Sequence, residues 1–204
     1  MIPRSLLSAA VLNLVLVACA LAENPFLSAK SDEPTLAKFQ GVEWNDEFEK
    51  DELPWTARVT TQRVATAPWG AFFKITFDQI ATKAPRPREM RPLYFFTTDQ
   101  EIVLLNEEHP EAAIRKLAVQ AKPPKFASSV IYGLSKGARK VSDGDVASAK
   151  LAVKGDQSSY SWTHHSGHFT TVVWQRGVGL IEYAQGYGAQ SDGFRLKRES
   201  GAKR

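Results

Sequence analysis

Three histidines crowd one short stretch of this sequence. His164, His165 and His168 are three of the four histidines in the chain, and they fall within five positions. Imidazole is the commonest metal ligand in proteins, and Glu182, on the hairpin that follows, is the nearest plausible carboxylate to complete a site. The spacing matches no zinc signature, because there is no His-Glu-x-x-His helix and no cysteine ligand. A solvated polar turn is the preferred interpretation; a divalent-metal site or a metal-dependent enzyme is the alternative.

Nucleophilic catalysis finds less support. A serine nucleophile needs a base beside it, the Gly-x-Ser-x-Gly motif is absent, and Ser161 and Ser166 lie in ordinary polar segments. The run Gly186-Tyr187-Gly188 lacks the following helix that a phosphate cradle needs, so we expect a wide hairpin loop with glycines at positive φ. The sequence therefore leans against an enzyme, assigns no catalytic residue, and predicts no cofactor apart from the alternative metal.

Aromatic residues form a second group of candidates. Trp162, Trp174 and Tyr183 lie on segments with strand-like alternation. Rings on a curved sheet either fill its core or contact a ligand. Core packing is the simpler interpretation. Contact with a ligand would make the domain a carrier of an apolar molecule inside a β-barrel, which is a further alternative.

The N-terminus predicts export. Arg4 precedes an apolar run from Leu6 to Val17, which is too short to span a bilayer, and the run Ala20-Leu21-Ala22 is typical of a signal-peptidase site. Residues 1–22 are therefore a predicted signal peptide, and the protein is expected to be periplasmic or extracellular. Cys19 leaves a second possibility open, because Leu16-Val17-Ala18-Cys19 resembles a bacterial lipobox whose cysteine is lipidated. Membrane contact is expected only through that lipid, and the mature fold has no disulfide, since Cys19 is the only cysteine.

The length and net charge of the chain limit which other kinds of function are plausible. The chain has 204 residues and a net charge of +4, and removal of the signal peptide lowers that charge by one. The basic residues are scattered, so nothing indicates nucleic-acid binding. An unidentified protein or envelope component is the expected partner, and the sequence does not predict the oligomeric state.

Period-two alternation of apolar and polar residues dominates the chain after residue 53. Trp55, Ala57 and Val59 alternate with polar residues, and Phe73, Ile75 and Phe77 repeat the pattern. Strands are predicted at 53–64, 73–77, 93–98, 102–105, 128–134, 146–153, 158–164, 168–174, 178–183 and 194–197. One helix is predicted at 110–121, beginning at Pro110.

These elements predict an α+β, mainly β fold. We expect an antiparallel meander sheet, either a half-barrel or a lipocalin-like barrel, with one packed helix. Residues 53–198 would form a single β-rich domain, and residues 199–204 a frayed tail. Residues 23–52 are interpreted as a mobile leader, with a helical turn at Thr35 to Phe39 and an irregular segment around Trp44.

One segment resembles a known group of proteins. Residues 173–183 contain the theme W-x-x-G-x-G-L-x-x-Y, from Trp174 to Tyr183. This is similar to the closing hairpin of uncharacterised bacterial exported proteins and lipoproteins. The resemblance implies a fold feature and brings no catalytic residue with it. Together with the export signal, it favours a non-enzymatic binding or structural domain of the cell envelope.

Overall fold

The structure is a computed structural model, and it describes residues 23–27, 33–47, 52–84, 88–105, 111–125, 130–142, 147–189 and 191–200. The predicted signal peptide with Cys19, the predicted helix start at Pro110 and residues 201–204 lie outside the described residues. Within the described part of the chain, no helix combines the length and the apolar character needed to cross a membrane.

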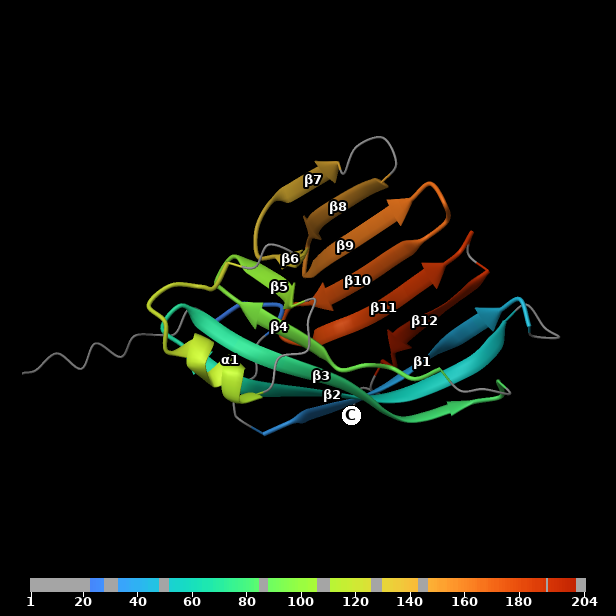
Figure 1. The fold of residues 1–204 in the computed structure, drawn as a ribbon, viewed down its shortest axis with the longest axis horizontal. Helices are drawn as coiled ribbons and strands as arrows, with labels where there is room; N and C mark the ends of the chain where they lie inside the picture. Colours follow the sequence, from blue (N-terminus) through green and yellow to red (C-terminus); the bar gives the residue numbers. More distant parts are fainter. Residues whose placement is uncertain are drawn as a thin grey trace, which may run out of the picture.

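Twelve strands form one antiparallel sheet (Figure 1), in the spatial order β6-β5-β4-β3-β2-β1-β12-β11-β10-β9-β8-β7. The first six strands are β1 (Thr35–Asn45), β2 (Leu53–Ala67), β3 (Gly70–Thr82), β4 (Leu93–Thr97), β5 (Glu101–Leu105) and β6 (Val130–Leu134). The last six are β7 (Ala138–Ser142), β8 (Ala147–Lys154), β9 (Gln157–His164), β10 (Phe169–Gln175), β11 (Gly179–Tyr187) and β12 (Asp192–Arg198). The predicted mainly β fold with a curled meander sheet is confirmed.

Alternation explains the longest strands as expected. In β2, Trp55, Ala57 and Val59 are buried in the main core, and the residues between them are more exposed. Phe73, Ile75 and Phe77 of β3 enter the same core. The period-two pattern therefore gives the sheet one apolar inner face, around which the chain curls.

The sheet nearly closes on itself, because β6 packs against the strands of the other half. The indole Nε1 of Trp174 on β10 donates to the carbonyl oxygen of Tyr132 on β6 at 3.2 Å. The rings of Tyr132 and Tyr160 stack with centroids 4.6 Å apart, and the backbone N–H of Leu134 donates to Ser158 Oγ at 3.0 Å. These side-chain contacts replace a backbone ladder at the seam, so the architecture is a half-barrel whose edges are bridged.

Helix α1 (Glu111–Ala118) covers part of the outer face and lies beside β2 and β3 in Figure 1. Ile114 and Ala118 are buried in a second core with Phe72 and Val103. Glu111 in the first turn favours the positive end of the helix dipole. The prediction of one helix packed on the sheet is confirmed.

The segment before β1 fills one end of the curl. Phe26 and Leu27 are each 1% exposed and belong to the main core. Asn24 holds the segment in place: its Oδ1 accepts from the backbone N–H groups of Phe26 and Leu27, and its Nδ2 donates to Thr98 O at 3.0 Å. We call this the plugged end.

Two expectations about residues 23–52 were wrong. Residues 35–45 form β1 in the middle of the sheet, paired with β2 and β12, instead of a helical turn and an irregular segment. The alternation of apolar and polar residues is missing from β1, because its inner face carries Gly41 and Glu43 as well as Phe39. Asn24, Phe26 and Leu27 are buried in a plug and are not part of a mobile leader. The short strand β7 was also missed, because its residues are mostly polar.

The final three strands are neighbours, as expected from their spacing. Val172 pairs with Tyr183, and Tyr183 pairs with Leu196. Gly177 adopts φ 70° in the turn between β10 and β11, a conformation that favours glycine. The predicted sheet of three closing strands is therefore confirmed.

Candidate functional site

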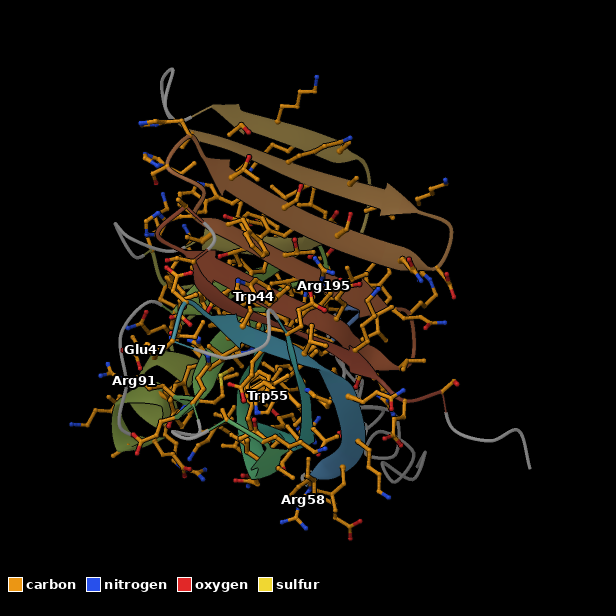
Figure 2. The ribbon with its side chains drawn as sticks, turned by 90° about the vertical axis from the view of Figure 1, so that its right-hand side faces the viewer. Trp44, Glu47, Trp55, Arg58, Arg91 and Arg195 are labelled. Atoms are coloured by element: carbon orange, nitrogen blue, oxygen red, sulfur yellow. The ribbon has the colours of Figure 1, made fainter. Side chains whose placement is uncertain are left out.

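Polar residues gather on the inner face at the end opposite the plug. Strands β1, β9 and β11 run the same way and finish there on Asn45, His164 and Tyr187. Figure 2 looks onto this end, with Trp55 inside the curl and Arg91 at the periphery. We call it the polar end.

The strand register shows how the inner face changes toward this end. One row across the sheet consists of Glu43, Phe194, Gln185, Thr170 and Trp162. The next row toward the plug consists of Gly41, Leu196, Tyr183, Val172 and Tyr160. A mostly apolar layer thus gives way to carboxylate, amide and hydroxyl groups within one step along each strand.

Glu43 is the most buried charged group at the polar end. It is 1% exposed, and its carboxylate accepts a hydrogen bond from the hydroxyl of Thr82 on β3. Thr82 Oγ1 in turn accepts from the backbone N–H of Ala84 at 3.0 Å. A buried carboxylate is costly unless hydrogen bonds satisfy it, so this chain of contacts fixes its position.

Arg88 reaches the same layer from the segment after β3. It forms an ion pair with Asp192, and its guanidinium lies over the rings of Tyr187 and Phe194 at 6.0 and 5.6 Å from their centroids. Its Nε is buried and finds no hydrogen-bond partner among the described residues. One face of the guanidinium is therefore packed while one donor stays unused.

Trp55 is a second donor without an acceptor. The side chain is fully buried, with its ring edge-on to Phe194 at 5.0 Å. Its Nε1 has no hydrogen-bond partner in the described part of the chain. Trp174, equally buried, donates its Nε1 to Tyr132. The contrast is informative, because buried indole N–H groups normally find a partner.

Four tyrosines surround this layer. Burial raises the pKa of Tyr160 to about 12, and burial followed by charge on neighbouring tyrosines raises the pKa of Tyr132 and of Tyr183. The pKa of Tyr187 is raised mainly by burial, lowered by Arg88 and raised by Asp192. Tyr187 donates to Gln185 Oε1 at 2.7 Å, whereas no described residue hydrogen-bonds the hydroxyls of the other three.

The histidine turn lies at the rim of the polar end, between β9 and β10. Ser166 Oγ is 2.6 Å from His164 Nδ1 and 2.7 Å from His168 Nδ1. Among the described residues, no group of three or more histidine, cysteine, aspartate or glutamate side chains is arranged to hold a metal. Glu182 does not reach the turn, because it pairs with Val173, four positions along β10 from Phe169, and faces Lys197 at 3.4 Å. The described side chains therefore do not form the predicted metal site, and metal binding stays a prediction.

Ser166 resembles a serine beside a base, which the sequence alone could not reveal. Two backbone N–H groups beside it are already used: Gly167 in the same turn donates to His164 O at 3.0 Å, and Ala189 in the turn after β11 donates to Ser166 O at 2.7 Å. An oxyanion needs free N–H donors. The contacts are consequently those of a cross-linked turn.

The three predicted aromatic residues have different positions. Trp174 and Tyr183 are buried in the main core, and Trp162 is half-buried at the polar end, stacked on His164 with centroids 6.1 Å apart. Of the three, Trp162 is the best placed to meet a ligand. Sequence reasoning missed Glu43 and Arg88, whose importance depends on closure of the sheet and leaves no local signal.

Gly186 also differs from expectation. It lies in β11, where a Cβ would collide with the ring of Phe169, whereas Gly188 and Ala189 after it have positive φ, at 48° and 53°. On the next strand, a Cβ at Gly193 would meet Trp44, and the rings of Trp44 and Phe169 are nearly parallel at 6.3 Å. These two glycines therefore let aromatic rings lie flat on the outer face.

Comparison with known proteins gives no family for this chain: no protein-family model matches it, and no curated protein shows significant similarity. The argument about function consequently depends on the geometry of the polar end.

Proposed function

We propose that this protein is a non-enzymatic binding domain that takes a small ligand with acceptor oxygens at the polar end. The observation that carries the proposal is that two buried donors at this end, Trp55 Nε1 and Arg88 Nε, have no acceptor among the described residues; Arg58 Nε on β2 is a third such donor. Each unsatisfied buried donor costs about 1–3 kcal/mol. A carboxylate, carbonyl or hydroxyl of a ligand would recover that cost.

The surroundings restrict the ligand further. The half-buried ring of Trp162 offers apolar contact, whereas the rings of Trp55 and Phe194 are buried in the main core, and Arg88 supplies a guanidinium paired with Asp192. Ligand sites typically combine aromatic walls with a few polar groups that set orientation. A small, partly apolar molecule with a carboxylate or carbonyl group fits this combination better than the purely apolar cargo considered from sequence.

Benzoate is a suitable probe, because it joins a ring to a carboxylate. Benzylamine is the matched control, with the same ring and a positive charge in place of the acceptor. We expect benzoate to raise the melting temperature of the protein in proportion to ligand occupancy, and benzylamine to leave it unchanged. Equal stabilisation by both compounds, or by neither, would contradict the proposal.

Two arginine variants locate the site. Arg88→Gln removes the guanidinium and should abolish the response to benzoate. Arg91→Gln removes an exposed guanidinium at the periphery of the same end and should leave the response intact. Loss of the response in both variants would indicate a general charge effect rather than a site at Arg88.

The setting that we propose is the cell envelope. The buried plug begins at Asn24, two residues after the predicted cleavage site at Ala22. Cleavage there would leave the plug at the start of the mature chain, and lipidation of Cys19 would attach the plugged end to a membrane. Mass analysis of the mature N-terminus distinguishes Glu23 from a lipidated Cys19.

A further inference from the structure

Two aromatic rings lie flat on the outer face of the sheet, above a pair of glycines. Gly186 of β11 and Gly193 of β12 face each other in the register. The ring of Phe169 covers Gly186 and the indole of Trp44 covers Gly193, because these are the side chains that an added Cβ would meet. The rings reach the glycines from β10 and from β1, on opposite sides of the pair. We call these two rings the aromatic platform.

The aromatic platform is nearly planar and partly open to solvent. The two ring planes differ by 14° and their centroids lie 6.3 Å apart. Each ring covers a different glycine, so the rings lie side by side. Both side chains are half-buried, which leaves part of each exposed. The face of an aromatic ring carries partial negative charge and attracts C–H groups. A flat ligand with C–H groups on its faces therefore fits this surface.

Hydroxyl groups continue the platform across the next two strands. Thr163 of β9 pairs with Phe169, and Ser148 of β8 pairs with Thr163. Both side chains are exposed, and their hydroxyl oxygens lie 3.1 Å apart. A hydroxyl both donates and accepts hydrogen bonds. A ligand that lies across the strands would thus pass from aromatic rings to polar partners.

Positive charge stands at both ends of the adjacent row. Arg195 of β12 and Lys150 of β8 belong to this row, and they are separated by the short side chains of Ala184, Thr171 and Ser161. Four strand spacings place them about 19 Å apart. Both are exposed, and neither forms an ion pair with a described residue.

The lysine end of this row carries a second, uncompensated charge. Lys140 of β7 lies directly opposite Lys150, and like charges in such a cross-strand pair are destabilising. Glu182, in the next row toward the plugged end, faces Lys197 at 3.4 Å. Figure 2 shows Glu47 on the opposite side of Trp44 from Arg195. An anion from outside the chain would therefore relieve the charge on this face.

We propose that the outer face binds a linear β-linked glycan that carries carboxylates on alternate sugars and lies across the strands from β1 to β8. Sugars with equatorial substituents are flat and present C–H groups to the aromatic platform. Their hydroxyls hydrogen-bond Thr163 and Ser148, and their carboxylates pair with Arg195 and Lys150. We call the surface made by these residues the glycan strip.

The spacing of charge favours such a glycan over a single-stranded nucleic acid. A nucleic-acid strand carries a phosphate at every nucleotide, and proteins that bind it follow its backbone with a positively charged groove. In the glycan strip, three uncharged residues separate Arg195 from Lys150. A polymer with fewer charges and many hydroxyls matches this pattern better.

Isothermal titration calorimetry with short hyaluronan oligosaccharides tests the proposal, because hyaluronan carries a carboxylate on alternate sugars. The matched control is the same oligosaccharide with its carboxylates reduced to alcohols. We expect the acidic form to bind about tenfold more tightly than the reduced form. An oligoglutamate peptide of equal charge lacks sugar rings and should bind about tenfold more weakly than hyaluronan.

Several results of this titration would overturn the proposal. Absence of hyaluronan binding is one, and equal affinity for the acidic and reduced oligosaccharides is another. Equal affinity for hyaluronan and the peptide would show that charge alone decides binding. Tighter binding of an oligothymidylate of equal charge would assign the surface to single-stranded nucleic acid.

Two charge variants locate the glycan strip. Arg195→Gln should weaken hyaluronan binding about tenfold, because it removes one of the two carboxylate partners. Lys154→Gln is the control, since Lys154 is exposed on the same strand and face as Lys150 but lies outside the glycan strip. Its affinity should stay as in the wild type. An equal loss in both variants would overturn the site.

A variant of the aromatic platform tests the stacking contact. Phe169→Ala removes one ring and should weaken hyaluronan binding about tenfold. Val173→Ala is the control on the same strand and face, in the row of Glu182, and should not change the affinity. Unchanged binding in Phe169→Ala would overturn the role of the platform. Arg195 is exposed, so Arg195→Gln decides the location of the site even if Phe169→Ala does not fold.

Competition with benzoate separates the glycan strip from the ligand site proposed inside the polar end. The two sites lie on opposite faces of the sheet, so saturating benzoate should leave hyaluronan affinity unchanged. Displacement of hyaluronan by benzoate would place both ligands at the polar end and overturn the outer site. If benzoate does not bind at all, the proposed function fails, and the hyaluronan titration still decides the glycan strip.

Discussion

The two ends of the curled sheet treat buried polar groups in opposite ways. At the plugged end, Asn24 is 1% exposed and both atoms of its amide are hydrogen-bonded. At the polar end, Trp55 is fully buried and its indole N–H has no acceptor among the described residues. The plugged end therefore satisfies the polar groups that it buries, whereas the polar end leaves the Trp55 and Arg88 donors without an acceptor among the described residues.

The largest effect should come from removing the plug. Phe26→Ala deletes a buried ring that packs in the main core and should lower the free energy of unfolding by about 3–5 kcal/mol, measured by urea denaturation. Leu36→Ala is the control, because Leu36 is 61% exposed and should change stability by less than about 0.5 kcal/mol. A small loss for Phe26→Ala would mean that residues 23–27 do not stabilise the fold.

The outer face at the polar end should resist added volume. Gly186→Ala pushes a Cβ into the ring of Phe169 and should cost about 1–3 kcal/mol. Phe169→Ala should suppress much of this cost, because the ring provides the three nearest contacts of the added Cβ. The stability cost of Gly193→Ala should persist in a Trp44→Ala background, because the added Cβ would also meet the carbonyl oxygen of Gln185. Equal suppression in both pairs would contradict these contacts.

Two substitutions, one at each end, should change the free energy of unfolding differently: one should lower it and the other should not. Asn24→Ala breaks three hydrogen bonds at the plugged end and should lower the free energy of unfolding by about 1–3 kcal/mol. Tyr183→Phe removes the hydroxyl of a buried side chain, to which no described residue is hydrogen-bonded, and should leave stability unchanged or raise it by up to about 1 kcal/mol. A clear loss with Tyr183→Phe would show that the hydroxyl is satisfied.

The smallest of the expected effects is a loss of stability at alkaline pH, caused by ionisation of tyrosines near the polar end. Tyrosines whose pKa is raised by folding stabilise the folded state below their ordinary pKa, near 10, and lose this contribution as pH rises. Burial raises the pKa of Tyr160 to about 12. We therefore expect stability to decline from about pH 10 to about pH 12, and less steeply in Tyr160→Phe. Absorbance at 295 nm follows the ionisation, and an identical decline in the variant would contradict the assignment.

Alternation was sufficient to predict most of the sheet, because strands such as β2 and β3 expose one face to the core along most of their length. It failed at β1, where Gly41 and Glu43 occupy inner positions that the pattern assigns to apolar residues. Gly41 faces a close neighbour in β12, and Glu43 meets Thr82 from β3. Both reasons are tertiary, so no local pattern could reveal them.

The candidate site was predicted in part. The histidine cluster and Trp162 were visible from residue type, and they do lie together at the polar end. The hydrogen bonds between Ser166 and the two imidazoles could be seen only from the geometry of the turn. Arg88 and Trp55 come from separate segments that meet only when the sheet curls around Phe194. Their unpaired donors are a property of packing, which sequence spacing does not encode.

The indole N–H of Trp55 provides the most direct test of the central claim. The chain has five tryptophans, so a nitrogen-15 correlation spectrum resolves five indole signals, and Trp55→Phe identifies one of them. On addition of benzoate, we predict that the Trp55 signal moves downfield and exchanges more slowly with solvent, while the signal of Trp174, already bonded to Tyr132, stays in place. A Trp55 signal that does not respond to benzoate would contradict the account.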